Sequence, residues 1–390
     1  MKILHITPTL DPAVGGLPMV VYRLAAAQAA LGHEVHILTY ASPHAQTQIE
    51  QAYAAVPHRQ LVHCHLLAPS SRFEFLVGRR ARAAVDQFIR ERPATALHLH
   101  GVWCATSLAA SKAARRLRHP YLLAPHSMLH RACLDNKWPK KQIAMYFGYR
   151  SMLTHAAAIH CLNEHECQAV LDLRLNVPSV ILPNGLFLEE VSSSPLPGSF
   201  HAAYPQLQGC PFILFIGRLH HVKGLDYLAD AFAILTQSNP QVQLVIVGPD
   251  AGEQAPFSRR VAHAGLTHRV HMLGPLYGSL KQAALADAAC YCLPSRLEGF
   301  SVAIAEALGC GVPVVISHQC NFPEVPLAGA GEAVPLDAPQ IAAALERVLS
   351  DPQRRLAMGQ AGRQLVASRY LWPQIAEQSL AIYQRILTPD

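Results

Sequence analysis

Two cations in the C-terminal half of the chain stand where they could bind an anionic ligand. Arg218 follows the apolar run Phe212–Ile216, and Lys223 comes five residues later, directly before a predicted helix. An Arg and a Lys at the carboxyl end of a parallel strand, next to a helix N-terminus, can neutralise a diphosphate. Either residue alone could be a solvated surface charge. Their joint position after an apolar strand favours a binding role.

Two carboxylates follow further along the chain. Glu298 lies in a loop after an apolar run, and Glu306 lies one turn or more inside the helix that this loop enters. Both can accept hydrogen bonds from ligand hydroxyl groups. Glu306 could be an ordinary helix-surface carboxylate, but its small apolar neighbours predict a mostly buried helix, in which an unpartnered carboxylate would be costly. The backbone N–H groups free for phosphate at this helix start belong to Phe300, Ser301 and Val302, after Gly299.

The N-terminal half offers weaker signals. Gly15 and Gly16 follow the first predicted strand and precede a helix, so their backbone N–H groups could face an anion, although a tight strand-to-helix turn is the alternative. Neither G-x-G-x-x-G nor G-x-x-x-x-G-K-[ST] occurs, which disfavours a nicotinamide enzyme and a P-loop ATPase. His126 follows the run Tyr121–Ala124 and is expected at the carboxyl edge of a sheet. The other histidines near strand ends are interpreted as structural: His98, His100, His160 and His165.

The elements that must position these residues alternate between short apolar runs and longer helical patterns, which predicts α/β domains with parallel sheets. In the first half the predicted strands are 3–6, 35–38, 96–99, 121–124, 158–161 and 180–182, and the predicted helices include 17–31, 73–90 and 142–153. In the second half the predicted strands are 212–216, 244–247, 270–273, 288–293 and 312–316. Successive helices are expected from Pro339 onward.

Length and composition favour two domains. A chain of 390 residues exceeds the size at which one hydrophobic core usually keeps growing. A Ser- and Pro-rich stretch predicts the boundary. We expect an N-terminal Rossmann-like domain over 1–188, a linker over 189–210, a C-terminal Rossmann-like domain over 211–370, and a C-terminal helix over 371–390 that packs back on the first domain.

Charge, motifs and cysteines together narrow the class of protein. The net charge of +6 suits anionic substrates, an anionic membrane face or nucleic acid, so charge alone does not choose among them. No Cys/His finger spacing and no interleaved basic and aromatic run occurs, so no nucleic-acid partner is expected. The ten cysteines are scattered and are interpreted as reduced thiols. No apolar stretch is long enough for a signal peptide or a membrane span, so we expect a cytoplasmic protein whose membrane contact, if any, is peripheral.

Taken together, these motifs resemble the retaining glycosyltransferases of the two-Rossmann (GT-B) architecture, in the group often called family 4. The resemblance rests on the order and spacing of five motifs over nearly the whole chain: Gly15-Gly16, Pro183-Asn184-Gly185, Gly217-Arg218 with Lys223-Gly224, Glu298-Gly299-Phe300 with Glu306, and Gly311-Val312-Pro313-Val314-Val315.

This resemblance implies a role for each matching residue. Arg218 and Lys223 would bind the donor diphosphate, Glu306 the nucleotide ribose, and Glu298 the hydroxyls of the transferred sugar. The amides of residues 300–302 and the Gly15-Gly16 turn would face the phosphates. His126 matches the family histidine that reaches the reacting sugar. Most relatives have glycine after that histidine, and Ser127 departs from this pattern.

The implied reaction moves a sugar from a UDP- or GDP-linked donor to a glycan or lipid-linked glycan acceptor, with retention of anomeric configuration. No H-E-x-x-H and no D-x-D sequence occurs, so neither a metal nor another cofactor is expected. Local likeness around residues 125–129 is to bacterial enzymes of polysaccharide or lipopolysaccharide assembly. The basic, aromatic segment 136–147 would suit the inner face of an anionic membrane, and a solvated helix start is the alternative. A sugar-nucleotide epimerase and a non-catalytic sugar-nucleotide-binding protein remain alternatives.

Overall fold

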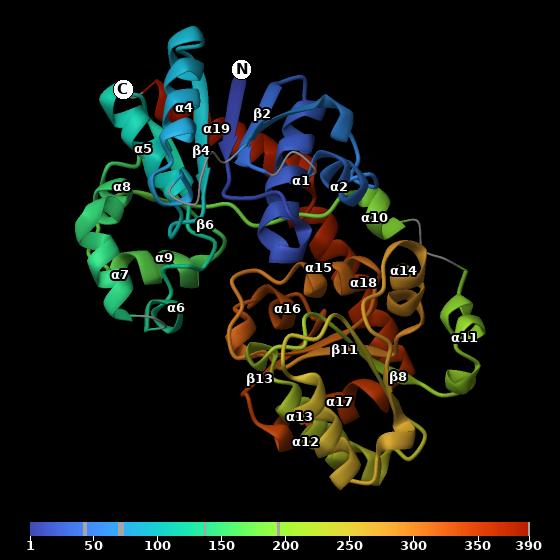
Figure 1. The fold of residues 1–390 in the computed structure, drawn as a ribbon. Coiled ribbons are helices and arrows are strands. Elements are labelled where there is room, and N and C mark those ends of the chain that lie inside the picture. The colour runs from blue at the N-terminus through green and yellow to red at the C-terminus, as the bar shows by residue number, and fades with distance from the viewer. Residues whose placement is uncertain (42–44, 69–73, 136–137, 193–195, 389–390) are drawn as a thin grey trace. The chain divides into compact units, whose positions relative to one another are not determined.

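The computed structural model describes residues 1–41, 45–68, 74–135, 138–192 and 196–388. The chain divides into two compact units (Figure 1). The first unit comprises Met1–Gly185 and Trp372–Asp390, and the second comprises Leu186–Leu371. Within the described residues, no helix is long and apolar enough to cross a membrane.

The first unit is built on a parallel sheet in the order β3-β2-β1-β4-β5-β6-β7. Its strands are β1 Lys2–Ile6, β2 Glu34–Tyr40, β3 Val62–Leu67, β4 Thr95–His100, β5 Tyr121–Ala124, β6 Ala158–Cys161 and β7 Ser179–Ile181. Its helices are α1 Gly16–Ala30, α2 Ala45–Ala52, α3 Glu74–Val77, α4 Arg79–Glu91, α5 Ala105–Arg116, α6 Arg131–Asp135, α7 Trp138–Ala144, α8 Arg150–Thr154, α9 Glu164–Asp172 and α19 Trp372–Leu387.

The second unit has a parallel sheet in the order β10-β9-β8-β11-β12-β13. Its strands are β8 Phe212–Ile216, β9 Gln243–Val247, β10 Val270–Met272, β11 Cys290–Leu293, β12 Val314–Ser317 and β13 Gly331–Val334. Its helices are α10 Leu188–Ser192, α11 Ser199–Ala203, α12 Leu225–Ser238, α13 Gln254–His263, α14 Gly278–Asp287, α15 Val302–Gly309, α16 Glu324–Leu327, α17 Ala338–Leu349 and α18 Pro352–Arg369. The α/β fold class with two parallel sheets flanked by helices is thus confirmed.

The C-terminal helix belongs to the first unit although it follows the second in sequence. The helix α19 packs against α1, and Figure 1 shows the red helix beside the blue one. Its apolar side chains Trp372, Ile375 and Tyr383 are buried. This confirms the expected return of the last helix to the first domain. The stretch predicted as a linker, 189–210, contains α10 and α11, and residues 193–195 within it lie outside the described part.

The structure has two strands that the sequence did not predict, and it interrupts two of the predicted helices. The strands β3 and β13 were not predicted, because β3 is a largely exposed edge strand with alternating histidines and β13 is a four-residue edge strand that begins with glycine. The helix predicted over 73–90 is two helices, α3 and α4, and Phe73 lies outside the described residues. Gly78 separates them with φ +64, and a Cβ there would lie 2.7 Å from that of Ala109.

The helix predicted over 142–153 is also interrupted. After α7 the segment Met145–Tyr149 leaves regular helical geometry, with Gly148 at φ 121, before α8 begins. A positive φ is available to glycine because it has no Cβ. The periodicity of the side chains continues through this bend, so the sequence pattern alone did not show it.

The two cores differ in chemistry. The second unit has an apolar core of aliphatic and aromatic side chains around its sheet. The first unit has such a core on part of its sheet. It also buries four strand histidines almost completely: His5, His98, His100 and His160. Burial lowers the pKa of His5 and of His160 to about 4, and it lowers the pKa of His98 and of His100 well below 6.5.

One prediction concerns close packing in the second unit. Gly359 lies inside α18, where glycine-to-alanine substitution normally favours the helix by about 1 kcal/mol. A Cβ at 359 would lie 2.2 Å from the carbonyl oxygen of Gly311. We therefore expect Gly359→Ala to destabilise the unit by about 1–3 kcal/mol, measured by urea denaturation. Gln360→Ala, at an exposed position of the same helix, is the control. A more stable Gly359→Ala protein would contradict the packing.

A second prediction follows from the buried histidines. In the unfolded chain each titrates near 6.5, but in the folded unit its pKa is lower, so the unfolded state binds more protons as the pH falls below 6.5. The contribution of these buried neutral histidines to the free energy of unfolding is therefore fully present well above pH 6.5 and is lost as the pH falls below that value. Between about pH 7.5 and about pH 5.5 the loss is about 1.4 kcal/mol for each of His5 and His160, or about 3 kcal/mol for these two, and His98 and His100 add to it in the same direction. Urea denaturation at these two pH values measures the loss. Equal stability at both would show that these imidazoles are not buried neutral.

Candidate functional site

In the second unit the candidate site lies at the carboxyl ends of β8 and β11. These two strands are neighbours, with β9 and β10 on one side and β12 and β13 on the other. The strand order therefore reverses between β8 and β11, which is the point where open parallel sheets bind ligands. The loop after β8 contains Arg218 and Lys223, and the loop after β11 contains Glu298.

Lys223 and Glu298 meet directly at this point. The Lys223 Nζ lies 2.6 Å from Glu298 Oε1, and the two side chains are only 23% and 9% exposed. The chain after Lys223 turns at Gly224, which has φ +69, and a Cβ there would lie 1.8 Å from the carbonyl oxygen of Pro294. Only glycine fits this approach. The two loops are therefore pressed together, and two predicted site residues 75 positions apart form one ion pair.

Arg218 stands apart from this pair. It is exposed, and its side chain forms no ion pair or hydrogen bond with another described residue. The backbone around it is fixed, because Gly217 N donates to Val247 O and Leu219 N donates to Pro249 O. A guanidinium without an internal partner on a fixed backbone is available to an anionic ligand.

The start of α15 supplies hydrogen-bond donors. Ser301 is the N-cap, and its Oγ accepts from Ile304 N. The Phe300 ring packs against the rings of Phe322 and Tyr370, with centroids 5.3 and 5.5 Å away, which anchors the loop. The backbone N–H groups of Phe300, Ser301 and Val302 make no hydrogen bond with described residues. They therefore remain as donors at the positive end of the helix dipole.

Glu306 has a partner that the sequence did not reveal. Its Oε1 accepts from Lys281 Nζ of α14 at 2.7 Å, and the side chains are 27% exposed for the lysine and 14% for the glutamate. Burying an unpaired carboxylate is costly, so the sequence predicts that Glu306 needs a partner on this apolar helix. The partner itself is 25 residues away on another helix, and no spacing rule identifies it.

A second brace between the same loops also escaped the sequence analysis. Arg296 binds both carboxylate oxygens of Asp226, at 2.9 and 2.6 Å, and it also donates to His221 O at 2.7 Å. Burial alone would raise the pKa of Asp226, but the hydrogen bonds from Arg296 lower it. Bidentate arginine–carboxylate pairs fix orientation as well as distance. This brace holds the backbone of the turn that contains Lys223.

In the first unit, the Gly15-Gly16 turn follows β1 through a short turn at Pro12–Val14. Gly15 has φ 134 and no side chain caps the N-terminus of α1, which begins at Gly16. Gly16 is exposed, and a Cβ built there meets no atom within 4 Å. The turn therefore presents backbone to open space. An approach to phosphates stays a prediction.

His126 sits in a strained turn at the end of β5. His126 and Ser127 have φ 52 and 63, in the left-handed region that disfavours side chains. The Ser127 N–H donates to the carboxylate of Glu166, whose other oxygen accepts from Leu162 N at 2.7 Å. The buried Glu166 side chain therefore holds this turn through the Ser127 amide. Burial raises the pKa of Glu166, and the two backbone N–H groups oppose that shift.

The His126 ring is bonded to the interior. Its Nε2 lies 2.9 Å from His100 Nδ1. Burial, and then the nearby His160, lower the pKa of His126 to about 3. His98, His100 and His160, for which the sequence predicts a structural role, belong to the same buried group. His165 is exposed and stacks on His130. Among described residues, one group brings ligand atoms close enough for a metal: His5, His98 and His100.

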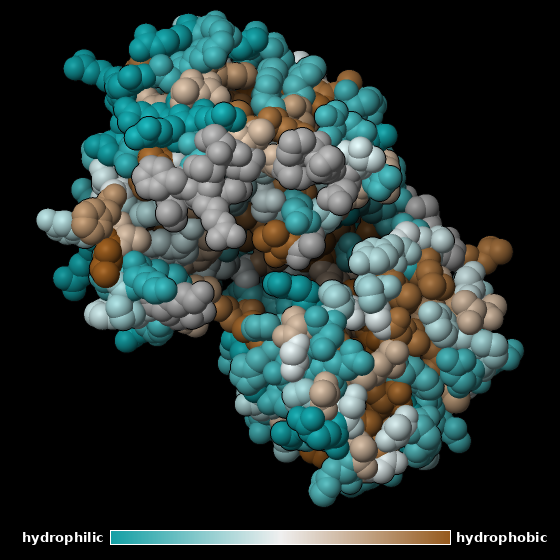
Figure 2. Space-filling view, viewed as in Figure 1, coloured by the Kyte–Doolittle hydropathy of each residue, from teal (hydrophilic) through white to brown (hydrophobic). Residues whose placement is uncertain are grey.

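Part of the basic, aromatic segment is exposed. Residues 136 and 137 lie outside the described part, but Trp138, Ile143, Tyr146 and Phe147 are between 52% and 86% exposed. Lys140 is exposed among them, while Lys141 lies over the Trp103 ring. Figure 2 shows apolar surface over α7 and the bend after it. The segment thus combines exposed apolar and basic side chains, as surface-binding helices do.

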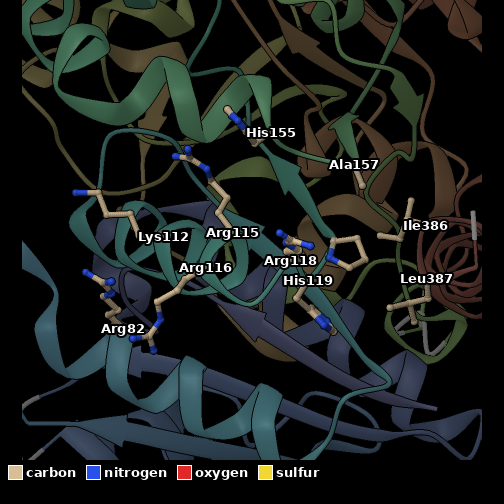
Figure 3. A pocket seen from close by; sticks show the side chains of 11 residues that line it. Arg82, Lys112, Arg115, Arg116, Arg118, His119, His155, Ala157, Ile386 and Leu387 are labelled. Carbon is tan, nitrogen blue, oxygen red and sulfur yellow. The ribbon is translucent and has the colours of Figure 1, made fainter.

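A large basic pocket lies in the first unit, at the end of the sheet opposite to His126 and Gly16. Its volume is about 1090 Å³, and its basic lining comes from α4, α5 and the turn before β5 (Figure 3). The charged lining residues are Arg82, Lys112, Arg115, Arg116 and Arg118, of which Arg116 pairs with Asp86. None of the predicted site residues lines it. It faces the amino ends of the strands, whereas His126 and Gly16 follow their carboxyl ends.

Two family models match the chain. The glycosyl transferase 4-like domain matches residues 15–185, and glycosyl transferases group 1 matches residues 200–365. Among curated relatives, a phosphatidyl-myo-inositol mannosyltransferase of Mycobacterium leprae is 33% identical over 218 residues, 55% of each chain. A D-inositol 3-phosphate glycosyltransferase of Jonesia denitrificans is 32% identical over 44% of this chain and 42% of its own. The chain spans about half the length of the curated relatives it matches.

Solved structures show the same fold over the whole length. A sucrose-phosphate synthase from Thermosynechococcus elongatus has a TM-score of 0.74 at 22% identity, covering 99% of both chains. Anabaena HepE in complex with UDP and glucose has a TM-score of 0.77 at 19% identity, covering 98% of this chain and 99% of its own. With one family model on each domain and this shared architecture, the chain belongs to the GT-B glycosyltransferases of the family 4 type.

Proposed function

We propose that this protein transfers a sugar from a nucleotide-sugar donor to a hydroxyl of a glycan or lipid-linked glycan, with retention of anomeric configuration and without a metal. One observation carries the donor assignment. Three groups lie on the loops of one strand-order reversal: the guanidinium of Arg218 and the amides at the start of α15, which have no partner among the described residues, and the ammonium of Lys223. This is a set of donors and charges for a diphosphate.

The Lys223–Glu298 pair gives donor binding a defined consequence. Glu298 neutralises the Lys223 charge at 2.6 Å. A diphosphate next to Lys223 would compete for its ammonium group and release Glu298 to accept hydrogen bonds from the hydroxyls of the sugar. Glu298 would then be a positioning group. The second carboxylate oxygen of Glu306, the one not held by Lys281, would accept from the ribose hydroxyls.

The same groups supply the chemistry. When the nucleotide leaves, negative charge builds on the diphosphate and positive charge on the anomeric carbon. Arg218, Lys223 and the α15 amides stabilise that developing charge without a metal ion. A leaving phosphate oxygen on the same face as the incoming hydroxyl can accept its proton, which gives retention by front-face attack. His126 would contact the reacting sugar from the first domain.

For the acceptor and the nucleotide we propose classes of compound and not single compounds. Several curated relatives are named for acceptors built on inositol phosphate, and one of these is named as GDP-mannose-dependent, whereas HepE is solved with UDP. We propose a UDP- or GDP-linked donor. The exposed apolar and basic residues of α7 and the following bend suit peripheral contact with the inner face of an anionic membrane, where a lipid-linked glycan would be presented.

Donor binding is tested by thermal shift with UDP, GDP, ADP and their sugar conjugates. A ligand at about 100 times its Kd stabilises the folded state by about 2.7 kcal/mol, so a selective rise in Tm is expected for one nucleotide. Lys223→Ala should raise the Kd of that ligand by about 10- to 100-fold, because the substitution removes a charge-assisted hydrogen bond. Arg260→Ala is the matched control, since Arg260 pairs with Asp230 on the surface of the same unit. Equal shifts in both variants would refute the site.

Transfer itself is tested by product analysis with and without EDTA. We expect free nucleotide and glycosylated acceptor in equal amounts, an unchanged rate after chelation, and a product anomer that matches the donor when examined by NMR. An inverted anomer or a rate restored only by added divalent metal would overturn the corresponding part of the mechanism. A changed sugar nucleotide without acceptor product would indicate an epimerase, and binding without turnover a non-catalytic relative.

A further inference from the structure

The interior of the first unit contains a continuous chain of hydrogen bonds that ends at His126. It connects five imidazoles, one amide and one phenol from β1, β4, β6, α1, α19 and the turn after β5. In order, its members are His126, His100, His5, Gln28, Tyr383, His98 and His160. Apart from His126, which is partly exposed, all are buried, with Tyr383 and Gln28 fully so.

Every contact in the chain is short enough to be a hydrogen bond. From His126 to Gln28 the distances are 2.9 Å to His100, 2.9 Å from His100 to His5, and 2.7 Å from His5 to the Gln28 Oε1. From Gln28 Nε2 they continue 3.0 Å to Tyr383, 2.8 Å to His98 and 3.0 Å to His160. The last imidazole lies 2.6 Å from the carbonyl oxygen of Leu182.

The carbonyl at the far end sets the direction of the first bonds. A backbone carbonyl can only accept, so His160 must carry its proton on Nε2. A neutral imidazole has one N–H, so the His160 Nδ1 accepts and His98 Nε2 donates to it. The remaining nitrogen of His98 is then an acceptor, and it receives the Tyr383 hydroxyl proton. Burial keeps these rings neutral, since it lowers the pKa of both histidines.

The same logic continues through the amide. Because Tyr383 donates to His98, its oxygen accepts from Gln28 Nε2, which also donates to Ser379 Oγ at 2.8 Å. Ser379 in turn donates to Ala376 O. The amide is therefore oriented with Oε1 toward His5, which must donate from Nε2. His5 Nδ1 accepts from His100 Nε2, and His100 Nδ1 accepts from His126 Nε2.

We propose that this chain, oriented by the Leu182 carbonyl, holds His126 as the imidazole protonated on Nε2, so that in the sugar contact of the proposed function His126 can only accept, through Nδ1, a hydrogen bond from a hydroxyl group. The Nδ1 of His126 makes no hydrogen bond with a described residue. A lone pair there can accept from a hydroxyl but cannot donate to a phosphate. His100, His5 and Gln28 are positioning residues. This assignment of the substrate hydroxyl rests on the proposed glycosyl transfer, whereas the tautomer does not.

A metal ion is the competing occupant of the same place. His5, His98 and His100 offer three nitrogens within 4.8 Å of one another. A metal on them would take the nitrogen pair that now forms the His5–His100 bond, and His98 would have to give up Tyr383 or His160. The hydrogen-bond chain satisfies every one of these nitrogens without such loss.

The wild-type protein provides the first test. NMR of protein with ¹⁵N-labelled imidazoles distinguishes Nε2–H from Nδ1–H tautomers, and single His→Gln variants assign the signals. We expect all five rings to be Nε2-protonated at neutral pH. His126 protonated on Nδ1, or a mixture of tautomers there, would overturn the proposal. So would one equivalent of metal in the purified protein. This result does not depend on any activity assay.

Variants provide the second test. Gln28→Leu removes the acceptor that orients His5, so His126 should become a mixture of tautomers, and kcat/KM should fall about tenfold through loss of one substrate hydrogen bond. Tyr53→Phe removes a comparable buried bond, from Tyr53 to Leu10 O, outside the chain. It should leave the His126 signal and kcat/KM unchanged. Unchanged His126 signals in a folded Gln28→Leu protein would refute the relay. Gln28→Met serves if the leucine variant does not fold.

If the tautomer is as proposed but Gln28→Leu retains full kcat/KM, the hydroxyl contact is refuted while the relay stands. If neither the wild-type protein nor the Gln28→Leu variant transfers sugar, the proposed function fails and the tautomer result is unaffected.

Discussion

The close approach of two loops determines the geometry of the candidate donor site. The loop after β8 turns at Gly224 against the carbonyl of Pro294, and the space there admits no Cβ. Because β8 and β11 are neighbours at the strand-order reversal, their carboxyl ends meet and their loops can touch. The Lys223–Glu298 pair and the Arg296–Asp226 brace then lock the contact. Arg218 and the α15 amides take their places relative to this locked backbone.

The pairing of the site charges has a physical consequence for ligand binding. Lys223 and Lys281 are each bound to a glutamate that is itself a predicted ligand group. Partly buried charges are less costly when they are paired than when one partner is missing. Under the proposed function, the donor diphosphate would displace Glu298 from Lys223, whereas Glu306 would accept from the ribose through the oxygen that Lys281 does not hold. Such exchange favours ligands that supply both an anion and hydroxyls, as a nucleotide sugar does.

Apart from the additional strand β7 of the first unit, the two sheets share a strand order, but the cores of the two units differ. The second unit fills its interior with aliphatic and aromatic side chains, whereas the first buries a line of imidazoles whose nitrogens are all bonded. Buried polar groups are costly unless satisfied, and a fully connected network fixes orientation more sharply than apolar packing does. In this unit the network reaches the turn that presents His126. The left-handed backbone of that turn is held from outside the network by Glu166.

The sequence by itself determined the alternation of strands and helices and therefore the α/β class, because apolar periodicity is local. It also determined which residues follow the carboxyl ends of strands, including Arg218, Lys223, Glu298 and His126. It missed the edge strands β3 and β13, whose exposed or short sequences lack that periodicity.

Only the tertiary structure decided which groups pair with the residues of the candidate site. Lys281 for Glu306, Asp226 for Arg296 and Glu166 for the Ser127 amide come from distant segments, and pairing across a fold leaves no fixed spacing in the chain. The sequence shows that histidines stand near the strand ends, but it does not show what their side chains contact. Their bonding depends on Gln28 in α1 and Tyr383 in the last helix, which folding brings together from 355 residues apart.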